Sequence, residues 1–184
     1  MNTFKVNGQH NSRDMGMIID EIFMVNKHFA STVQGLTVYT KPQPLVFEIN
    51  TPNNYTNDIY QWWNMLPVIQ YMQDSKVPIL CTVSGTCRNA FVMMLIHGKK
   101  GMRKMYKYGQ IEIQPIGSWG GRWQNKKSKQ DESDNHKKLE LFVYEILQKY
   151  TKMPDSEIKK MFWEELSYDA ATAKRYGLID EIIG

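Results

Sequence analysis

The stretch that decides how this chain folds is Val83-Ser84-Gly85-Thr86-Cys87-Arg88-Asn89-Ala90-Phe91-Val92-Met93-Met94. It begins at the end of an apolar segment typical of a buried strand, passes through a tight turn, and continues as an apolar helix. A strand that turns sharply into a helix is the arrangement that presents a nucleophile at an elbow. The tip of this elbow holds Cys87, Arg88 and Asn89, and no serine.

The segments before the elbow predict a parallel sheet. Residues 44–50 and 77–83 are short apolar strands, and residues 58–74 between them have apolar side chains at three- and four-residue spacing. A strand, a helix and a strand in this order form a right-handed crossover with parallel strands. Trp62 and Trp63 fall in the predicted helix, where the spacing places at least one of them in the core and leaves a ligand platform as the alternative.

The rest of the chain predicts a single α/β domain over residues 1–184. Residues 1–15 are polar and predict a flexible arm, residues 17–24 are apolar and compatible with a strand, and residues 110–115 alternate as a strand does. A long helix is expected to end near Tyr150, another to begin at Pro154, and a short one to cover residues 169–175, with Gly177 at the position that closes a helix.

Composition narrows the functional classes. The chain has 184 residues, a formal net charge of +4 and two cysteines, Cys81 and Cys87, without metal-ligand spacing to the histidines. We therefore expect no metal and no cofactor.

The N-terminus lacks an apolar signal core and the longest apolar run, Ala90 to Ile96, is too short to span a bilayer, so we expect a cytoplasmic, organellar or phage-encoded protein without membrane contact. The basic residues predict solvated faces rather than a nucleic-acid surface.

Four segments resemble one known family. They are Phe47-Glu48-Ile49-Asn50-Thr51-Pro52-Asn53-Asn54, Cys87-Arg88-Asn89-Ala90-Phe91, Ile111-Glu112-Ile113-Gln114-Pro115, and the block from Tyr150-Thr151-Lys152-Met153-Pro154 to Tyr176-Gly177-Leu178-Ile179-Asp180. Over about residues 44 to 183 the chain resembles the ClpP proteolytic subunits of the ClpP/crotonase superfamily. The resemblance implies an α/β fold of repeated β-β-α spiral units, with a strand-helix handle over about residues 110–150.

The family uses a Ser–His–Asp triad and an oxyanion hole of backbone N–H groups, and this sequence departs from that set. The resemblance places the nucleophile position on Cys87, or on Arg88 or Asn89 if the register slips, the base position on Ile113 and the acid position on Glu165. A serine hydroxyl needs a base to take its proton, and isoleucine cannot accept one.

The oxyanion-like positions fall on Asn53 and Arg88, and the family's glycine pair is Asn53-Asn54. The side chains of Asn53 and Asn54 would narrow the oxyanion site, so this departure from the glycine pair does not favour catalysis. None of the four histidines, His10, His28, His97 and His136, matches the family's base position, so Cys87 is expected to be a small buried cysteine rather than a catalytic thiol.

These departures predict a non-catalytic subunit that assembles into a ring, heptameric by resemblance, alone or with an active ClpP-type subunit and an ATP-dependent unfoldase. Trp119, Trp123 and Gln114 are candidate interface residues, with simple packing as the equal alternative for the two tryptophans. One alternative is an enzyme with altered chemistry on the same scaffold, either a cysteine-type peptidase or a crotonase-like acyl-CoA enzyme. Another is an interaction protein that binds an acidic partner through the basic loop at residues 99–107.

Overall fold

Two β-sheets form the centre of the computed structural model, which describes residues 2–7, 12–35, 43–52, 59–117 and 126–184. The larger sheet is parallel and has the order β1-β2-β3-β5-β8. Its strands are β1 (Asn2–Val6), β2 (Leu45–Ile49), β3 (Ile79–Val83), β5 (Arg103–Tyr106) and β8 (Glu181–Ile183). The smaller sheet has the order β4-β6-β7. It comprises β4 (Thr86–Arg88), β6 (Gln110–Ile113) and β7 (Leu166–Asp169).

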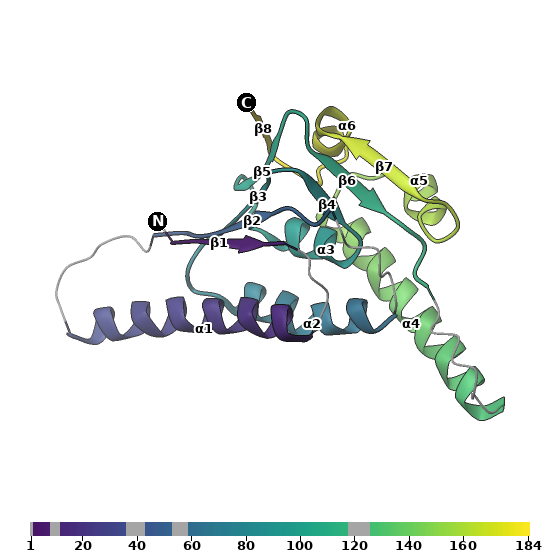
Figure 1. The fold of residues 1–184 in the computed structure, drawn as a ribbon, viewed down its shortest axis with the longest axis horizontal. Coiled ribbons are helices and arrows are strands. Elements are labelled where there is room, and N and C mark those ends of the chain that lie inside the picture. The colour runs from purple at the N-terminus through teal and green to yellow at the C-terminus, as the bar shows by residue number, and fades with distance from the viewer. Residues whose placement is uncertain (1, 8–11, 36–42, 53–58, 118–125) are drawn as a thin grey trace.

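Helices surround these sheets (Figure 1). Their bounds are α1 (Ser12–Gly35), α2 (Ile59–Asp74), α3 (Ala90–His97), α4 (Lys126–Tyr150), α5 (Asp155–Lys160) and α6 (Ala170–Arg175). Helices α1 and α2 lie side by side along one side of the larger sheet, and the first half of α4 projects away from the rest of the molecule (Figure 1). The sequence prediction of an α/β fold is confirmed.

The chain passes from the larger sheet to the smaller one twice, each time before a helix. β3 leads through Gly85 into β4 and α3, and β5 leads through Gly109 into β6 and α4. A Cβ at Gly85 would lie 2.5 Å from Oδ1 of Asn50, so a larger residue there would displace the Asn50 side chain that accepts from the N–H of Thr86. This β-β-α repeat is the spiral unit that the resemblance implies.

Helix α3 is buried on all sides. Every residue from Ala90 to Ile96 has at most 2% of its surface exposed. A helix that is apolar all round has no solvent-facing stripe, so it must lie inside the protein.

The N-terminal prediction was wrong in two respects. Residues Asn2–Val6 pair in parallel with β2, so they are part of the sheet and not of a flexible arm. Residues 17–24, compatible with a strand by composition, lie within α1. The burial of Met15, Ile18 and Ile22 at three- and four-residue spacing explains the helix, because this spacing places them on one face toward the core.

The predicted short C-terminal helix and its closing glycine are confirmed, whereas strand β7 before them was not predicted. Asp169 caps α6 by accepting a hydrogen bond from the backbone N–H of Thr172 at 2.8 Å. Gly177 follows the helix with φ 70°, and the N–H groups of Gly177 and Leu178 donate to the carbonyls of Lys174 and Ala173. These are the two hydrogen bonds of a Schellman motif.

One ion pair joins the residue before β8 to the first residue of its neighbouring strand β5. Oδ1 of Asp180 lies 2.6 Å from a terminal nitrogen of Arg103, and Oδ2 accepts from Nε and the backbone N–H of Arg103 and from the N–H of Gly101. The two side chains are only 5% and 18% exposed. Burial raises the pKa of Asp180, but the hydrogen bonds and charge of Arg103 outweigh it, so the pKa is lowered overall.

We expect Asp180→Ala to lower the free energy of unfolding by about 3 kcal/mol, because it leaves the Arg103 charge buried without its partner. Chemical denaturation measures this loss. Glu181→Ala is the matched control: it removes the neighbouring, more exposed pair with Lys104 and should cost less than about 1 kcal/mol. Equal losses in the two variants would contradict the assignment.

The contribution of Asp180 should also depend on pH. Because its folded pKa is lowered, the stabilisation is fully present above the unfolded pKa of about 4 and is lost as the pH falls through the folded value. The difference in unfolding free energy between the wild type and Asp180→Ala should therefore shrink below about pH 4. A difference that stays constant on acidification would show that the carboxylate charge is not responsible.

Candidate functional site at the elbow

The elbow between β4 and α3 is formed by one residue in an unusual backbone conformation. Asn89 has φ 51° and ψ −124°, and among the described residues it is the one non-glycine residue with positive φ. Such a conformation costs about 1–3 kcal/mol and persists only where the surroundings hold it. Asn89 is fully buried, its N–H donates to the carbonyl of Glu112, and its carbonyl accepts from Val92.

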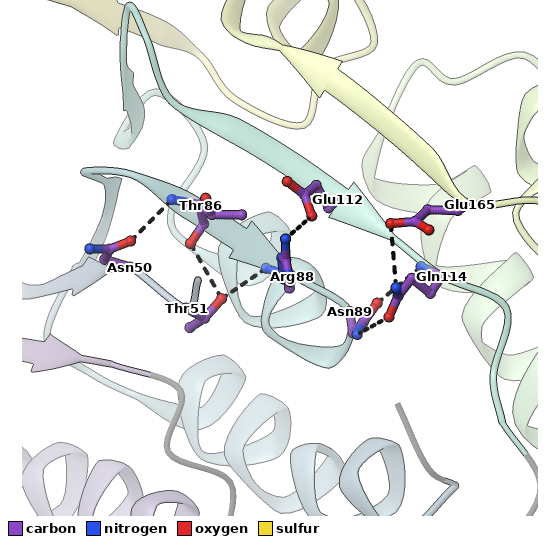
Figure 2. Close-up of polar contacts among 8 residues, drawn as sticks. All are labelled: Asn50, Thr51, Thr86, Arg88, Asn89, Glu112, Gln114 and Glu165. Atoms are coloured by element: carbon purple, nitrogen blue, oxygen red, sulfur yellow. Dashed lines mark hydrogen bonds and ion pairs between the residues drawn. The ribbon is translucent and has the colours of Figure 1, made fainter. Parts of the chain in front are cut away.

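The side chains of Asn89, Gln114 and Glu165 form a chain of hydrogen bonds (Figure 2). Nδ2 of Asn89 donates to Oε1 of Gln114 at 3.3 Å, and Oδ1 of Asn89 accepts from the backbone N–H of Gln114 at 3.0 Å. Nε2 of Gln114 in turn donates to Oε1 of Glu165 at 3.3 Å. Residues from the elbow, the end of β6 and the start of β7 thus meet in the order amide, amide, carboxylate.

A second polar pair lies beside this chain, on the same face of the smaller sheet (Figure 2). Arg88 and Glu112 are directly opposite each other on β4 and β6, and their side chains form an ion pair at 2.5 Å. The two side chains are 20% and 14% exposed. The face of β4 and β6 next to the elbow is therefore occupied by an ion pair within the protein.

The outer edge of β4 is closed by the end of β2. Oγ1 of Thr51 accepts from the N–H of Arg88 at 2.9 Å, and the N–H of Thr51 donates to the carbonyl of Thr86 at 2.6 Å. Oδ1 of Asn50 accepts from the N–H of Thr86 at 3.1 Å. Because the N–H of Arg88 already has an acceptor, it is not available to an oxyanion, the role for which Arg88 was a candidate.

Cys87 and Ile113 lie on the opposite face of the same strands, in the core, and both are fully buried. Burial raises the pKa of the Cys87 thiol well above its usual value, and the nearby Cys81 thiol adds to the shift. A buried thiol with a raised pKa is unreactive, because the thiolate is the nucleophile.

The structure thus separates the candidate site residues into two groups. It brings Glu165 into contact with Gln114, which in turn contacts Asn89, and it places Cys87 and Ile113 on the opposite face, in the core. Gln114 was singled out from sequence only as an interface residue. Asn53, Trp119 and Trp123 lie outside the described residues, so the predictions for them stay predictions. The contact between Asn89 and Gln114 was missed because it depends on the register between β4 and β6.

The described histidine side chains lie elsewhere. His97 is at the far end of α3, about 12 Å from the elbow at 1.5 Å per residue. Its Nδ1 is 2.7 Å from the carbonyl of Met93, its ring packs on Tyr150, and burial lowers its pKa. His136 pairs with Glu140 on α4. In the described part of the chain, no cluster of three or more metal-ligating side chains occurs, and no helix is long and apolar enough to cross a membrane.

Comparison with known proteins identifies relatives of this architecture. A model of the Clp protease family matches residues 17–184. Among solved structures, the chain is similar to a peptidase from Plasmodium falciparum, with a TM-score of 0.76 and 18% sequence identity, over 99% of this chain and 95% of that chain. At that identity the structural likeness shows the fold. No match was found among curated proteins.

We expect both cysteine thiols of the folded protein to resist a disulfide reagent such as DTNB at mildly alkaline pH. Both are fully buried, and burial raises the pKa of Cys81 to about 12. Thiol release followed by absorbance measures the reaction, and the same protein in guanidinium chloride is the control, in which both thiols should react. Rapid reaction of Cys87 in the folded protein would contradict its placement in the core.

Proposed function

This chain belongs to the Clp protease family, and we propose that it acts there as a subunit that assembles with other subunits but does not cleave peptide bonds. The observation that supports this proposal most directly is the hydrogen-bonded chain of Asn89, Gln114 and Glu165. Its order from elbow to carboxylate corresponds to nucleophile, base and acid in a Ser–His–Asp triad.

The geometry favours a register different from the one expected from sequence. The nucleophile position moves from Cys87 to Asn89, because Asn89 occupies the strained turn at which an elbow presents its nucleophile. The base position moves from Ile113 to Gln114, which contacts both neighbours. The acid position stays on Glu165. Asn89 was one of the alternatives that a slipped register allowed.

An amide–amide–carboxylate chain keeps the contacts of a triad but lacks its chemistry. A carboxamide is a poor nucleophile, and its nitrogen does not accept a proton near neutral pH. Gln114 therefore can neither activate a hydroxyl nor protonate a leaving amine, the two tasks of the histidine. Glu165 orients Gln114, but the Gln114 amide takes up no proton near neutral pH, so the carboxylate has no proton transfer to assist.

The alternatives have less support. A cysteine peptidase would need an exposed, low-pKa thiol, whereas Cys87 is buried with a raised pKa. A crotonase-like enzyme would need free backbone donors at the elbow, and the N–H of Arg88 is bound to Thr51. An acidic partner at the loop of residues 99–107 would rely on Lys99, Lys100 and Lys107, since Arg103 and Lys104 already bind Asp180 and Glu181.

Assembly is the remaining role. The family's subunits form rings by resemblance, and we propose that this chain joins such a ring, alone or with an active Clp-type subunit served by an ATP-dependent unfoldase. The long helix α4, which projects from the molecule after β6, is the candidate handle for contacts between subunits (Figure 1).

We expect the purified protein to release no fluorophore from a peptide substrate and to take up no fluorophosphonate probe. The double variant Asn89→Ser/Gln114→His restores a serine and a histidine beside Glu165, and it should become labelled by the probe, because the scaffold still aligns these three positions. Asn89→Ser alone is the matched control and should stay unlabelled. Turnover by the wild type that disappears in Cys87→Ala would overturn the proposed function.

We also expect native mass spectrometry to show an oligomer of this chain, or a mixed oligomer when an active Clp-type subunit is added. The measurement uses the full chain, alone and in mixtures of known ratio. A monomer in every mixture would contradict the assembly role while leaving the peptidase result unaffected.

A further inference from the structure

One histidine of the described chain lies where three helices meet. His97 is the last residue of α3, and its ring packs on the ring of Tyr150 at the end of α4, with 4.7 Å between the ring centres. The hydroxyl of Tyr150 in turn accepts a hydrogen bond from Nε2 of Gln73 on α2 at 3.3 Å, and α2 packs along both α3 and α4. A change in the charge of the His97 ring would therefore act on the contacts among these helices.

The hydrogen bond of the ring fixes where its hydrogen lies. Nδ1 of His97 is 2.7 Å from the carbonyl oxygen of Met93. A carbonyl only accepts, so Nδ1 carries the hydrogen of the neutral ring, and Nε2 keeps its lone pair. Nε2 is buried and has no hydrogen-bond partner among the described residues. These surroundings suit the neutral imidazole, because its one donor is already bonded.

Protonation would place a second hydrogen on Nε2, where it has no acceptor. The imidazolium is a donor at both nitrogens, and burying a charge costs more than burying a neutral polar group. Burial therefore lowers the pKa of His97. The bond to the Met93 carbonyl opposes this shift, since it favours the protonated ring, but burial outweighs it.

The charges around the ring add to the cost of protonation. Lys149, next to Tyr150 on α4, lowers the pKa of His97 further, and its ammonium lies 5.1 Å from the centre of the Tyr150 ring. A protonated His97 would thus face a cation that already occupies the same aromatic ring. No other charged residue at the adjoining ends of α2, α3 and α4 is among the groups that shift its pKa; these residues are Asp74, Lys99, Lys100, Glu145 and Lys152.

We propose that His97 is a pH-sensitive contact: the neutral ring holds the C-terminal end of α4 against α3, and protonation of the ring releases that end. The contact is independent of the proposed function, because it involves no residue of the elbow and needs no partner chain.

The direction of the pH dependence follows from the burial of the ring. Because the folded pKa of His97 is lowered, the contact is fully formed above the unfolded pKa of about 6.5 and weakens as the pH falls below it. This range lies above pH 4, where the Asp180 carboxylate begins to lose its contribution, so the two effects are separable.

The test is amide hydrogen exchange of the full chain at pH 7.5 and pH 5.5, corrected for the intrinsic dependence of exchange on pH. The last turn of α4, residues 147–150, should lose protection several-fold at pH 5.5. The limit is about tenfold, because pH 5.5 is one unit below the unfolded pKa of about 6.5. His97→Phe keeps a ring against Tyr150 but cannot be protonated, so its protection should be the same at both pH values.

His136→Gln is the matched control. It removes a histidine that lies on α4 itself and pairs with Glu140, so this variant should keep the full loss of protection. An equal loss in His97→Phe, unchanged protection in the wild type, or an equal loss in the central strands of the larger sheet would overturn the proposal. If His97→Phe does not fold, an NMR titration of the wild-type ring decides the question: a midpoint at or above about pH 6.5 would contradict it.

Discussion

The burial of α3 is the constraint on which the rest of the structure depends. Seven consecutive apolar residues, Ala90 to Ile96, have no exposed side, so the helix must be enclosed by other elements. The larger sheet covers it through β3, where the Cys81 thiol lies 3.8 Å from the carbonyl of Met94. Helices α2 and α4 enclose it further, and Tyr150 at the end of α4 packs on His97. Because α3 begins directly after β4, its burial also determines where the elbow lies.

The elbow has a strained backbone at a position that holds asparagine. Asn89 holds a positive φ, which a non-glycine residue adopts only at a cost. Two backbone and two side-chain hydrogen bonds to β6 and α3 hold it there, with the Gln114 side chain extending the connection to Glu165. These contacts join the smaller sheet to the core helix, a structural task that requires neither a serine nor a histidine. The amide of Asn89 is buried and has partners for both its donor and its acceptor, which stabilises such a junction.

Much of the fold could be predicted from the sequence, and the errors have identifiable causes. The apolar runs of β2 and β3 and the spacing in α2 are local signals, and Asp169 with Gly177 marks both ends of α6. The strand β1 was missed because a polar segment such as residues 2–6 pairs through its backbone, which composition does not reveal. Of the residues in the hydrogen-bonded chain at the elbow, Glu165 was named from sequence as the acid position, Asn89 was one of several alternatives for the nucleophile position, and the contacts of Gln114 were not predicted.

The sequence by itself determined the α/β class, the buried helix and the absence of serine at the elbow, because these follow from local patterns of residue type. Only the tertiary structure decided which residue occupies the elbow tip and what it contacts. Cys87 and Asn89 are two residues apart, yet one lies in the core and the other in the turn, because the short pairing of β4 with β6 places Cys87 opposite Ile111 and Arg88 opposite Glu112. A shift of one residue exchanges the two faces of a strand, and that register is set by long-range packing.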